Sequence, residues 1–188
     1  MKKTILASLV AILAAGSAAA QTSVSIAVSD VEATSNGAKS DRYILGVKTA
    51  IGKTGLTGDL NVSNTRKEST AALSNRTEVG VTAPVFSAGI FSGSVRGATG
   101  AKMVSGSDTT YYYSIEPGVS VKLTDALSAR VAYRFRDAYA SDVADRSNSA
   151  RVGVSYALTK ADSVGLSYDH VRGDGAEKAL TVGYTRSF

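Results

Sequence analysis

The sequence contains no cysteine and no tryptophan, only two prolines and a single histidine. Without cysteine the chain has no disulfide framework, no metal–thiolate site and no thiol nucleophile. After the first 20 residues, no run reaches the roughly 18 consecutive apolar residues that indicate a transmembrane helix. The formal net charge is +5, of which Lys2 and Lys3 contribute two, and no basic stripe indicates nucleic-acid binding.

The first 20 residues have the pattern of a secretory signal peptide. Met1-Lys2-Lys3 is a charged start, residues 4–15 are mostly apolar, and the alanines at 18–20 fit a cleavage site before Gln21. We therefore expect residues 1–20 to be removed and residues 21–188 to form a single domain.

The remaining chain alternates between apolar and polar residues, as strands with two different faces do. The alternating segments are approximately 22–31, 42–51, 56–65, 76–85, 90–99, 110–122, 127–136, 149–158, 163–171 and 178–188. Tight turns are expected at 52–55, 86–89, 123–126 and 159–162, and longer polar loops at 32–41, 66–75, 100–109, 137–148 and 172–177. Segments of about 10 residues suit tilted membrane-spanning strands. The pattern predicts an all-β, closed, antiparallel transmembrane β-barrel of ten strands. Eight strands is the alternative, if the weakly patterned first or fifth segment fails.

A secreted soluble barrel or sandwich would also alternate, with its apolar face turned inward. The aromatic residues argue against it, because they gather toward the two ends of the apolar face and leave its middle aliphatic. A bilayer with two interfaces selects such girdles. The predicted girdle residues are Tyr43, Phe91, Tyr111, Tyr113, Tyr133, Phe135, Tyr156, Tyr168, Tyr184 and Phe188.

The opposite face carries charges that we expect to line the lumen. The predicted pore-lining residues are Arg42, Arg76, Glu78, Arg96, Glu116, Arg130, Arg134, Arg136, Arg151 and Asp169. Folding each tight turn about its centre brings opposite charges together across neighbouring strands. The predicted pairs are Lys48 with Asp59, Glu78 with Arg96, Glu116 with Arg134, and Arg151 with Asp169.

The end of the chain resembles the closing strand of Gram-negative outer-membrane β-barrels, which alternates and ends in an aromatic residue, here Phe188. Arg186 departs from the pattern, since the family more often has an aromatic or apolar residue there. Tyr156-Ala157-Leu158-Thr159-Lys160 also resembles a turn of the porin superfamily, although the chain is about half the length of trimeric porins. The resemblance implies an outer-membrane location, contact with lipid and lipopolysaccharide, and assembly by the barrel-assembly machinery through the last strand.

The inner face suggests a function. Unpaired basic residues attract anions and repel cations in a narrow tube. We expect a small porin-like channel for small hydrophilic solutes that prefers anions, with a field created by Arg42, Arg76, Arg130, Arg134 and Arg136 and shaped by Glu78 and Glu116. The alternative is a closed barrel with a structural or surface-interaction role, because side chains fill the smallest barrels.

Several motifs are expected to have no chemical role. Asp169 and His170 are neighbours on a strand and so point to opposite faces, which disfavours an acid–base dyad. We expect no enzyme activity, metal or cofactor. Glycines within strands are expected to ease curvature and close packing, and Pro117 to mark a bulge or another irregularity in its strand.

Overall fold

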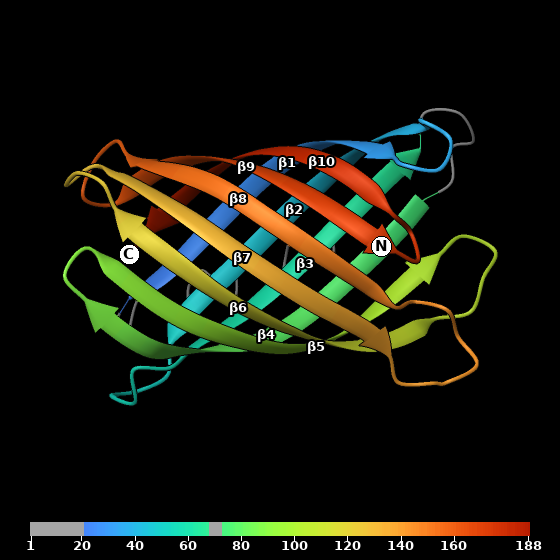
Figure 1. Cartoon of the computed structure of the whole chain (residues 1–188), viewed down its shortest axis with the longest axis horizontal. Coiled ribbons are helices and arrows are strands. Elements are labelled where there is room, and N and C mark those ends of the chain that lie inside the picture. Colours follow the sequence, from blue (N-terminus) through green and yellow to red (C-terminus); the bar gives the residue numbers. More distant parts are fainter. Residues whose placement is uncertain (1–20, 68–72) are drawn as a thin grey trace.

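The computed structural model describes residues 21–67 and 73–188, so the expected signal peptide and part of the expected loop at 66–75 lie outside the described residues. Ten antiparallel strands each pair with their sequence neighbours, and the first also pairs with the last, which closes a barrel (Figure 1). This confirms the predicted fold class and excludes the eight-stranded alternative. The strands are β1 (Thr22–Ala33), β2 (Lys39–Ala50), β3 (Thr57–Lys67), β4 (Leu73–Ala88), β5 (Phe91–Val104), β6 (Thr110–Lys122), β7 (Leu127–Ala138), β8 (Ser147–Ala157), β9 (Asp162–Gly173) and β10 (Glu177–Ser187).

The seam of the barrel joins β1 to β10. Its register runs from Ser23 opposite Ser187 to Ala33 opposite Glu177. The Phe188 N–H donates a further hydrogen bond to the carbonyl of Thr22 (N···O 2.8 Å). Closure removes both free edges, so every strand has a neighbour on each side.

The two ends of the barrel are named here by their connections. The turn end holds the connections at 51–56, 89–90, 123–126 and 158–161, and it lies to the left in Figure 1. The first residue of β1 and the last residue of β10 also lie there. The loop end, to the right, holds residues 34–38, 105–109, 139–146 and 174–176. Strands extend into the expected long loops, so the predicted contrast in length is weak, and the connection at 174–176 is shorter than the one at 51–56.

The turn between β4 and β5 differs from the prediction. Only Gly89 and Ile90 connect the two strands, and residues 86–88 continue β4, so the expected turn at 86–89 is wrong. Gly89 has a φ of 59°, in the left-handed region that glycine adopts without a Cβ penalty. Periodicity alone misplaced this turn because Phe86 reads equally well as strand or turn.

The bulge also lies elsewhere than expected. The register of β4 against β5 shifts between Pro84 and Phe86. Proline lacks the N–H that a ladder hydrogen bond needs, which accounts for an irregularity at Pro84. Pro117 marks an irregularity without a bulge. The β6–β7 ladder has no pair at Glu116 and Pro117, although its register is the same before and after them, and β6 stays paired with β5 through Pro117.

The exterior of the barrel carries an aliphatic belt at mid-height. The exposed side chains of this belt include Ile26, Val28, Val79, Val81, Val131, Val152, Val154, Leu166 and Val182. Apolar surface this continuous is unfavourable in water and suits a hydrocarbon layer. A closed barrel with such an exterior is the architecture of an outer-membrane protein. In the described part of the chain, no helix is long and apolar enough to cross a membrane.

The predicted girdle residues lie on this outer face. The exposed ones are Tyr43, Phe91, Tyr111, Tyr133, Tyr156, Tyr168 and Phe188. Tyr113, Phe135 and Tyr184 are half-buried. The Tyr113 ring packs against Phe135 (centroids 6.1 Å apart) and against Tyr139 (5.5 Å). Tyr139, which lies at the loop end just after β7, is a further aromatic residue of this group that was not among the predicted girdle residues.

Candidate functional site

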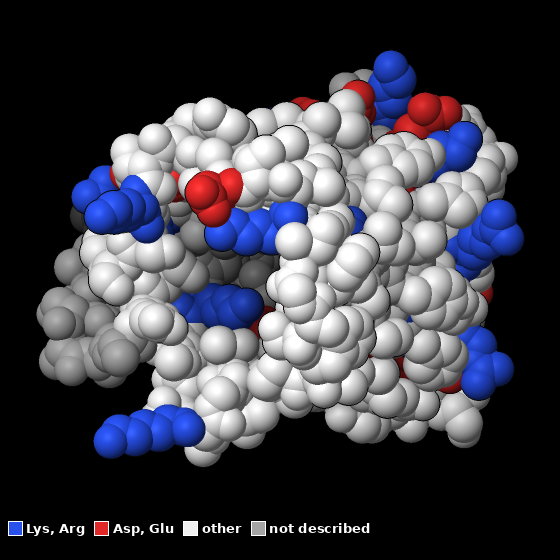
Figure 2. All heavy atoms as spheres, turned by 60° about the vertical axis from the view of Figure 1, so that its left-hand side comes forward, with Lys and Arg blue, Asp and Glu red and all other residues white. Residues whose placement is uncertain are grey.

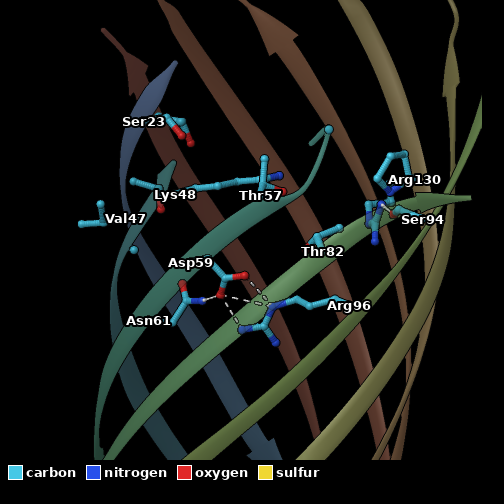
Figure 3. A pocket seen from close by; sticks show the side chains of 15 residues that line it. Ser23, Val47, Lys48, Thr57, Asp59, Asn61, Thr82, Ser94, Arg96 and Arg130 are labelled. Carbon is cyan, nitrogen blue, oxygen red and sulfur yellow. Dashed lines mark hydrogen bonds and ion pairs between the residues drawn. The ribbon is translucent and has the colours of Figure 1, made fainter. Parts of the chain in front are cut away.

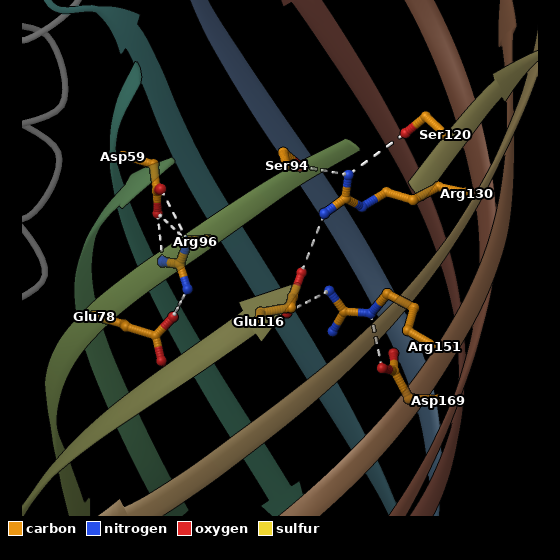
Figure 4. Close-up of polar contacts among 9 residues, drawn as sticks. All are labelled: Asp59, Glu78, Ser94, Arg96, Glu116, Ser120, Arg130, Arg151 and Asp169. Carbon is orange, nitrogen blue, oxygen red and sulfur yellow. Dashed lines mark hydrogen bonds and ion pairs between the residues drawn. The ribbon is translucent and has the colours of Figure 1, made fainter. Parts of the chain in front are cut away.

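Charged side chains cross the middle of the lumen in two networks (Figure 4). In the first, the Arg96 guanidinium on β5 is shared by two carboxylates. Its Nη2 lies 2.5 Å from Oδ2 of Asp59, and its Nη1 lies 2.5 Å from Oε1 of Glu78. All three side chains are about a tenth exposed or less, so each charge depends on its partners for compensation.

Gly80 allows this network to form. Asp59 on β3 lies opposite Gly80 on β4, so Arg96 must pass over β4 to reach it. A Cβ at Gly80 would lie 2.5 Å from Nη2 of Arg96. Gly118 on β6 serves Arg130 in the same way, with a Cβ position 2.5 Å from Nη2 of Arg130. These two strand glycines are thus crossing points for arginines.

The second network runs from β6 to β9. Glu116 lies between two arginines, with Oε1 3.6 Å from Nη2 of Arg130 and Oε2 4.0 Å from Nη1 of Arg151. Arg151 lies opposite Asp169 in the β8–β9 register, and its Nε is 2.7 Å from Oδ1 of Asp169. Arg130 Nη1 also donates a hydrogen bond to Oγ of Ser94 (3.2 Å).

Two predicted ion pairs are wrong. Lys48 does lie opposite Asp59, but Arg96 occupies the Asp59 carboxylate, and no carboxylate of the described residues comes within 4.0 Å of Lys48. Glu116 is likewise bound by Arg130 and Arg151 instead of Arg134. Directly opposed positions do not decide pairing here, because an arginine can span more than one strand.

The predicted contact between Glu78 and Arg96 exists by a different route. The altered β4–β5 turn shifts the register, so Glu78 lies opposite Gly100 and Arg96 lies opposite Thr82. The length of the Arg96 side chain restores the contact.

The lumen toward the loop end is filled with side chains. Tyr112 is completely buried there, and the guanidinium carbons of Arg76 and Arg136 lie 5.7 and 5.3 Å from its ring centroid. Such cation–π contacts favour burial of both partners. Arg42 is bound by Glu177 (Nη2 to Oε1, 2.6 Å). Further buried residues that surround this part of the lumen are Ser29, Val31, Ser114, Ser147, Ser149 and Ala179.

The lumen toward the turn end is hollow. One cavity of about 480 Å³ is lined by polar residues that include Ser23, Lys48, Thr57 and Asp59 (Figure 3). A second cavity of about 410 Å³ is lined largely by serine, threonine and glycine from β8, β9, β10 and β1. Figure 2 shows the opening at this end, with basic side chains inside it.

A third cavity, of about 210 Å³, lies at mid-height between the hollow and the filled parts. Five arginines and two glutamates line it: Arg42, Arg76, Arg96, Arg134, Arg151, Glu78 and Glu116. Among the described residues, the ion pairs of the lumen leave Arg76 and Arg134 without a carboxylate partner. Nε of Arg76 is buried and has no hydrogen-bond acceptor in the same part of the chain. Two guanidinium groups of this cavity, those of Arg76 and Arg134, are therefore not neutralised by an ion pair within the described residues.

Three lumen residues were missing from the predicted set. Tyr112 shares the parity of Ser114 and Glu116, so alternation alone could have placed it inside. Lys102 lies on β5, past residue 99, where the alternating pattern predicted that the strand ends. Asp145, which is 1% exposed, lies in the 139–146 connection, where no periodicity indicates which side chains turn inward.

Comparison with known proteins supports the fold. No protein-family model matches the chain, and no curated protein matches it in sequence. The NanC porin in a rhombohedral crystal form aligns with a TM-score of 0.55 and 8% identity, over 87% of this chain and 100% of that chain. The translocator domain of the autotransporter NalP from Neisseria meningitidis gives 0.52 and 10%, over 89% and 88%.

The KdgM porin in complex with disordered oligogalacturonate gives a TM-score of 0.50 and 16% identity, over 87% of this chain and 99% of that chain. At these identities the likeness concerns the fold alone. That fold is the small porin-like outer-membrane barrel that the C-terminal hairpins predicted.

Proposed function

We propose that this protein is a porin-like channel for small hydrophilic solutes and that it prefers anions. The observation that carries the proposal is the mid-height cavity, which five arginines and two glutamates line. Arg42, Arg96 and Arg151 each have a carboxylate partner, whereas Arg76 and Arg134 have none among the described residues. A solute that moves along the barrel would pass these two guanidinium groups.

The narrow lumen strengthens this effect. Charges lining a low-dielectric tube act on an ion more strongly than the same charges on an open surface, and they attract ions of opposite sign. Arg130, which shares the Glu116 carboxylate with Arg151, extends the basic lining toward the turn end, whereas Asp145 compensates Arg136 toward the loop end. Glu78 and Glu116 then shape the field by holding Arg96 and Arg151 in place.

Two proteins of the same fold support the channel assignment. NanC and KdgM are both described as porins, and KdgM is described in complex with oligogalacturonate, whose sugar units carry carboxylates. An outer-membrane barrel with a positive lumen suits solutes of that charge. The proposal assigns no solute beyond this chemical class.

Planar-bilayer recording tests the proposal. In a potassium chloride gradient, the wild type should conduct in steps, and its reversal potential should show chloride preference. The double substitution R76Q/R134Q should move the reversal potential toward the cation side. R172Q is the control for each of the single substitutions R76Q and R134Q, because it removes one positive charge from the exposed outer face of β9. Cation preference in the wild type would contradict the proposal.

The alternative function, a closed barrel with a structural or surface-interaction role, has one observation in its favour. Tyr112, Arg136 and Asp145 are almost fully buried and fill the lumen toward the loop end. A barrel that never conducts would satisfy this alternative. Complete absence of conductance steps from correctly folded protein would favour it over the channel.

The proposal includes no catalysis. Arg151 holds Asp169 inside the lumen, while Nε2 of His170 accepts a hydrogen bond from Nε of Arg172 (3.2 Å).

The aliphatic belt and the aromatic residues would contact outer-membrane lipid and lipopolysaccharide, and β10 would present the assembly signal to the barrel-assembly machinery. The turn end would then face the periplasm and the loop end the exterior.

A further inference from the structure

The connection between β7 and β8, residues 139–146, turns one side chain into the barrel. Its residues 140–144 are exposed. Asp145, in contrast, is 1% exposed and lies at the loop end of the lumen. A carboxylate buried to this degree in a loop needs strong local compensation.

Two cations from different strands supply that compensation. Nζ of Lys102 on β5 lies 2.8 Å from Oδ1 of Asp145. Arg136 on β7 contacts both oxygens, with Nη2 3.1 Å from Oδ1 and Nε 3.1 Å from Oδ2. The Asp145 carboxylate therefore ties the 139–146 connection to the wall formed by β5, β6 and β7.

The neighbouring residue fixes the base of the same connection to the rim. The Arg146 N–H donates to Oδ2 of Asp174 (2.9 Å), and the Asp174 N–H donates to the Arg146 carbonyl (2.8 Å). Nε of Arg146 also lies 3.0 Å from Oδ2 of Asp137. These contacts lie outside the lumen, so within the described part of the chain Asp145 provides the inward attachment of residues 139–146.

The contacts of Asp145 with Lys102 and Arg136 depend on the negative charge of its carboxylate, so neutralising this group should break them. Without the carboxylate charge, Lys102 and Arg136 would be two like charges facing each other in a confined space, and they would repel. Arg136 would then lose its anchor beside Tyr112, against which its guanidinium packs. The filled part of the lumen would loosen from the loop end inward.

We propose that residues 139–146 form a gate over the loop end of the lumen and that Asp145 is its latch. This inference rests on the proposed channel function and concerns its regulation. The gate is closed when Asp145 bridges Lys102 and Arg136. It opens when that bridge is released, which connects the mid-height cavity to the exterior.

Single-channel recording of D145N, beside D142N and the wild type, tests the gate. Asp142 lies in the same connection and is exposed, so D142N removes an equal charge without touching the bridge. D145N should raise the open fraction roughly tenfold or more, because loss of a buried bridge strongly shifts a two-state equilibrium. D142N should match the wild type. Heat-dependent gel migration would verify that each variant is folded.

The possible outcomes separate the gate from the channel. Equal conductance in the wild type and D145N would overturn the gate and leave the channel intact. No conductance in either protein would overturn both proposals. Activation by D142N as strongly as by D145N would also overturn the latch, because it would indicate a general charge effect.

A second measurement does not depend on current. The chain has no cysteine, so S114C would introduce a single thiol. Ser114, on β6, is 2% exposed and lies opposite Arg136 of β7, one of the two residues that bind Asp145. A membrane-impermeant maleimide applied to intact cells should label S114C/D145N at least about tenfold faster than S114C, following the same shift in population. Equal labelling rates would overturn the gate.

Discussion

The loop-end and turn-end halves of the lumen are built by the same ten strands with the same alternation, yet one is filled and the other is hollow. Toward the loop end, Tyr112, Arg136 and Asp145 are buried against one another. Toward the turn end, two cavities of about 480 and 410 Å³ are lined mainly by small polar side chains. Strand number therefore does not decide whether a barrel of this size is open.

The difference arises from which side chains occupy the inner positions. Serine, threonine and glycine leave space along β8, β9, β10 and β1. One tyrosine, together with long cationic side chains and a carboxylate from a connection, removes that space at the other end. Substitution of a few inner residues should therefore alter one half of the lumen without affecting the other.

The largest effect is expected at Tyr112. Its truncation, Y112A, should open a gap in the filled half and lower the free energy of unfolding by about 3 kcal/mol, the usual cost of removing a buried aromatic side chain. Y111A is the matched control, because Tyr111 is adjacent but 63% exposed on the outer face. Urea titration of the barrel in lipid vesicles measures both. Equal losses would show that the filled half is not packed more tightly than the exterior.

An intermediate effect is expected at Gly80, where Arg96 crosses β4. G80A should displace the guanidinium from Asp59 and lower the free energy of unfolding by about 1–3 kcal/mol, as overpacking does. At Gly165, on the hollow side, the nearest atom to an added Cβ is the Val154 carbonyl oxygen at 3.5 Å, an ordinary contact. G165A should therefore change stability by no more than about 0.5 kcal/mol. The same titration compares the two variants, and a neutral G80A would contradict the crossing.

The smallest effect is expected outside the lumen, at the β6–β7 turn. Nζ of Lys122 lies 2.8 Å from Oδ1 of Asp125, and the hydrogen bond that Lys122 donates lowers the pKa of the Asp125 carboxyl. A lowered pKa stabilises the fold above the ordinary carboxyl pKa, and this contribution is lost as the pH falls through the lowered value. Both side chains are solvated, so the pair contributes little. D125N should leave the urea midpoint at pH 7 unchanged within error. A clear loss would show that turn charges matter as much as lumen charges.

The fold could be predicted almost completely from the sequence. The ten strands and their two faces follow from a period of two residues, which is a local property, and closure was expected because a sheet with an apolar outer face leaves no edge unpaired in a membrane. The turn at Gly89 and Ile90 could not be placed, since Phe86, Ser87 and Ala88 fit either a strand or a turn. Because this turn was misplaced, the predicted β4–β5 register was wrong, and Glu78 lies opposite Gly100 instead of Arg96.

The lumen could be predicted only in part. Alternation placed the arginines inside but not their contacts, because a guanidinium can reach across a glycine to a second strand, as Arg96 does at Gly80. Asp145 could not be found at all, since its burial depends on Arg136 of the preceding strand and on Lys102 of β5, which is distant in sequence. Contacts made by long side chains and loops depend on three-dimensional closure, which no local pattern encodes.

The seam between β1 and β10 has a consequence for biogenesis. β1 and β10 lie at opposite ends of the described chain, so one row of β1 amides and carbonyls stays without a partner until the last strand joins the sheet. Until β10 has joined the sheet, the sheet has two unpaired edge strands, which can pair with other chains and cause aggregation. A chaperone that shields β1 during transit would therefore protect the most vulnerable species, and the arrival of β10 would end that need in one step.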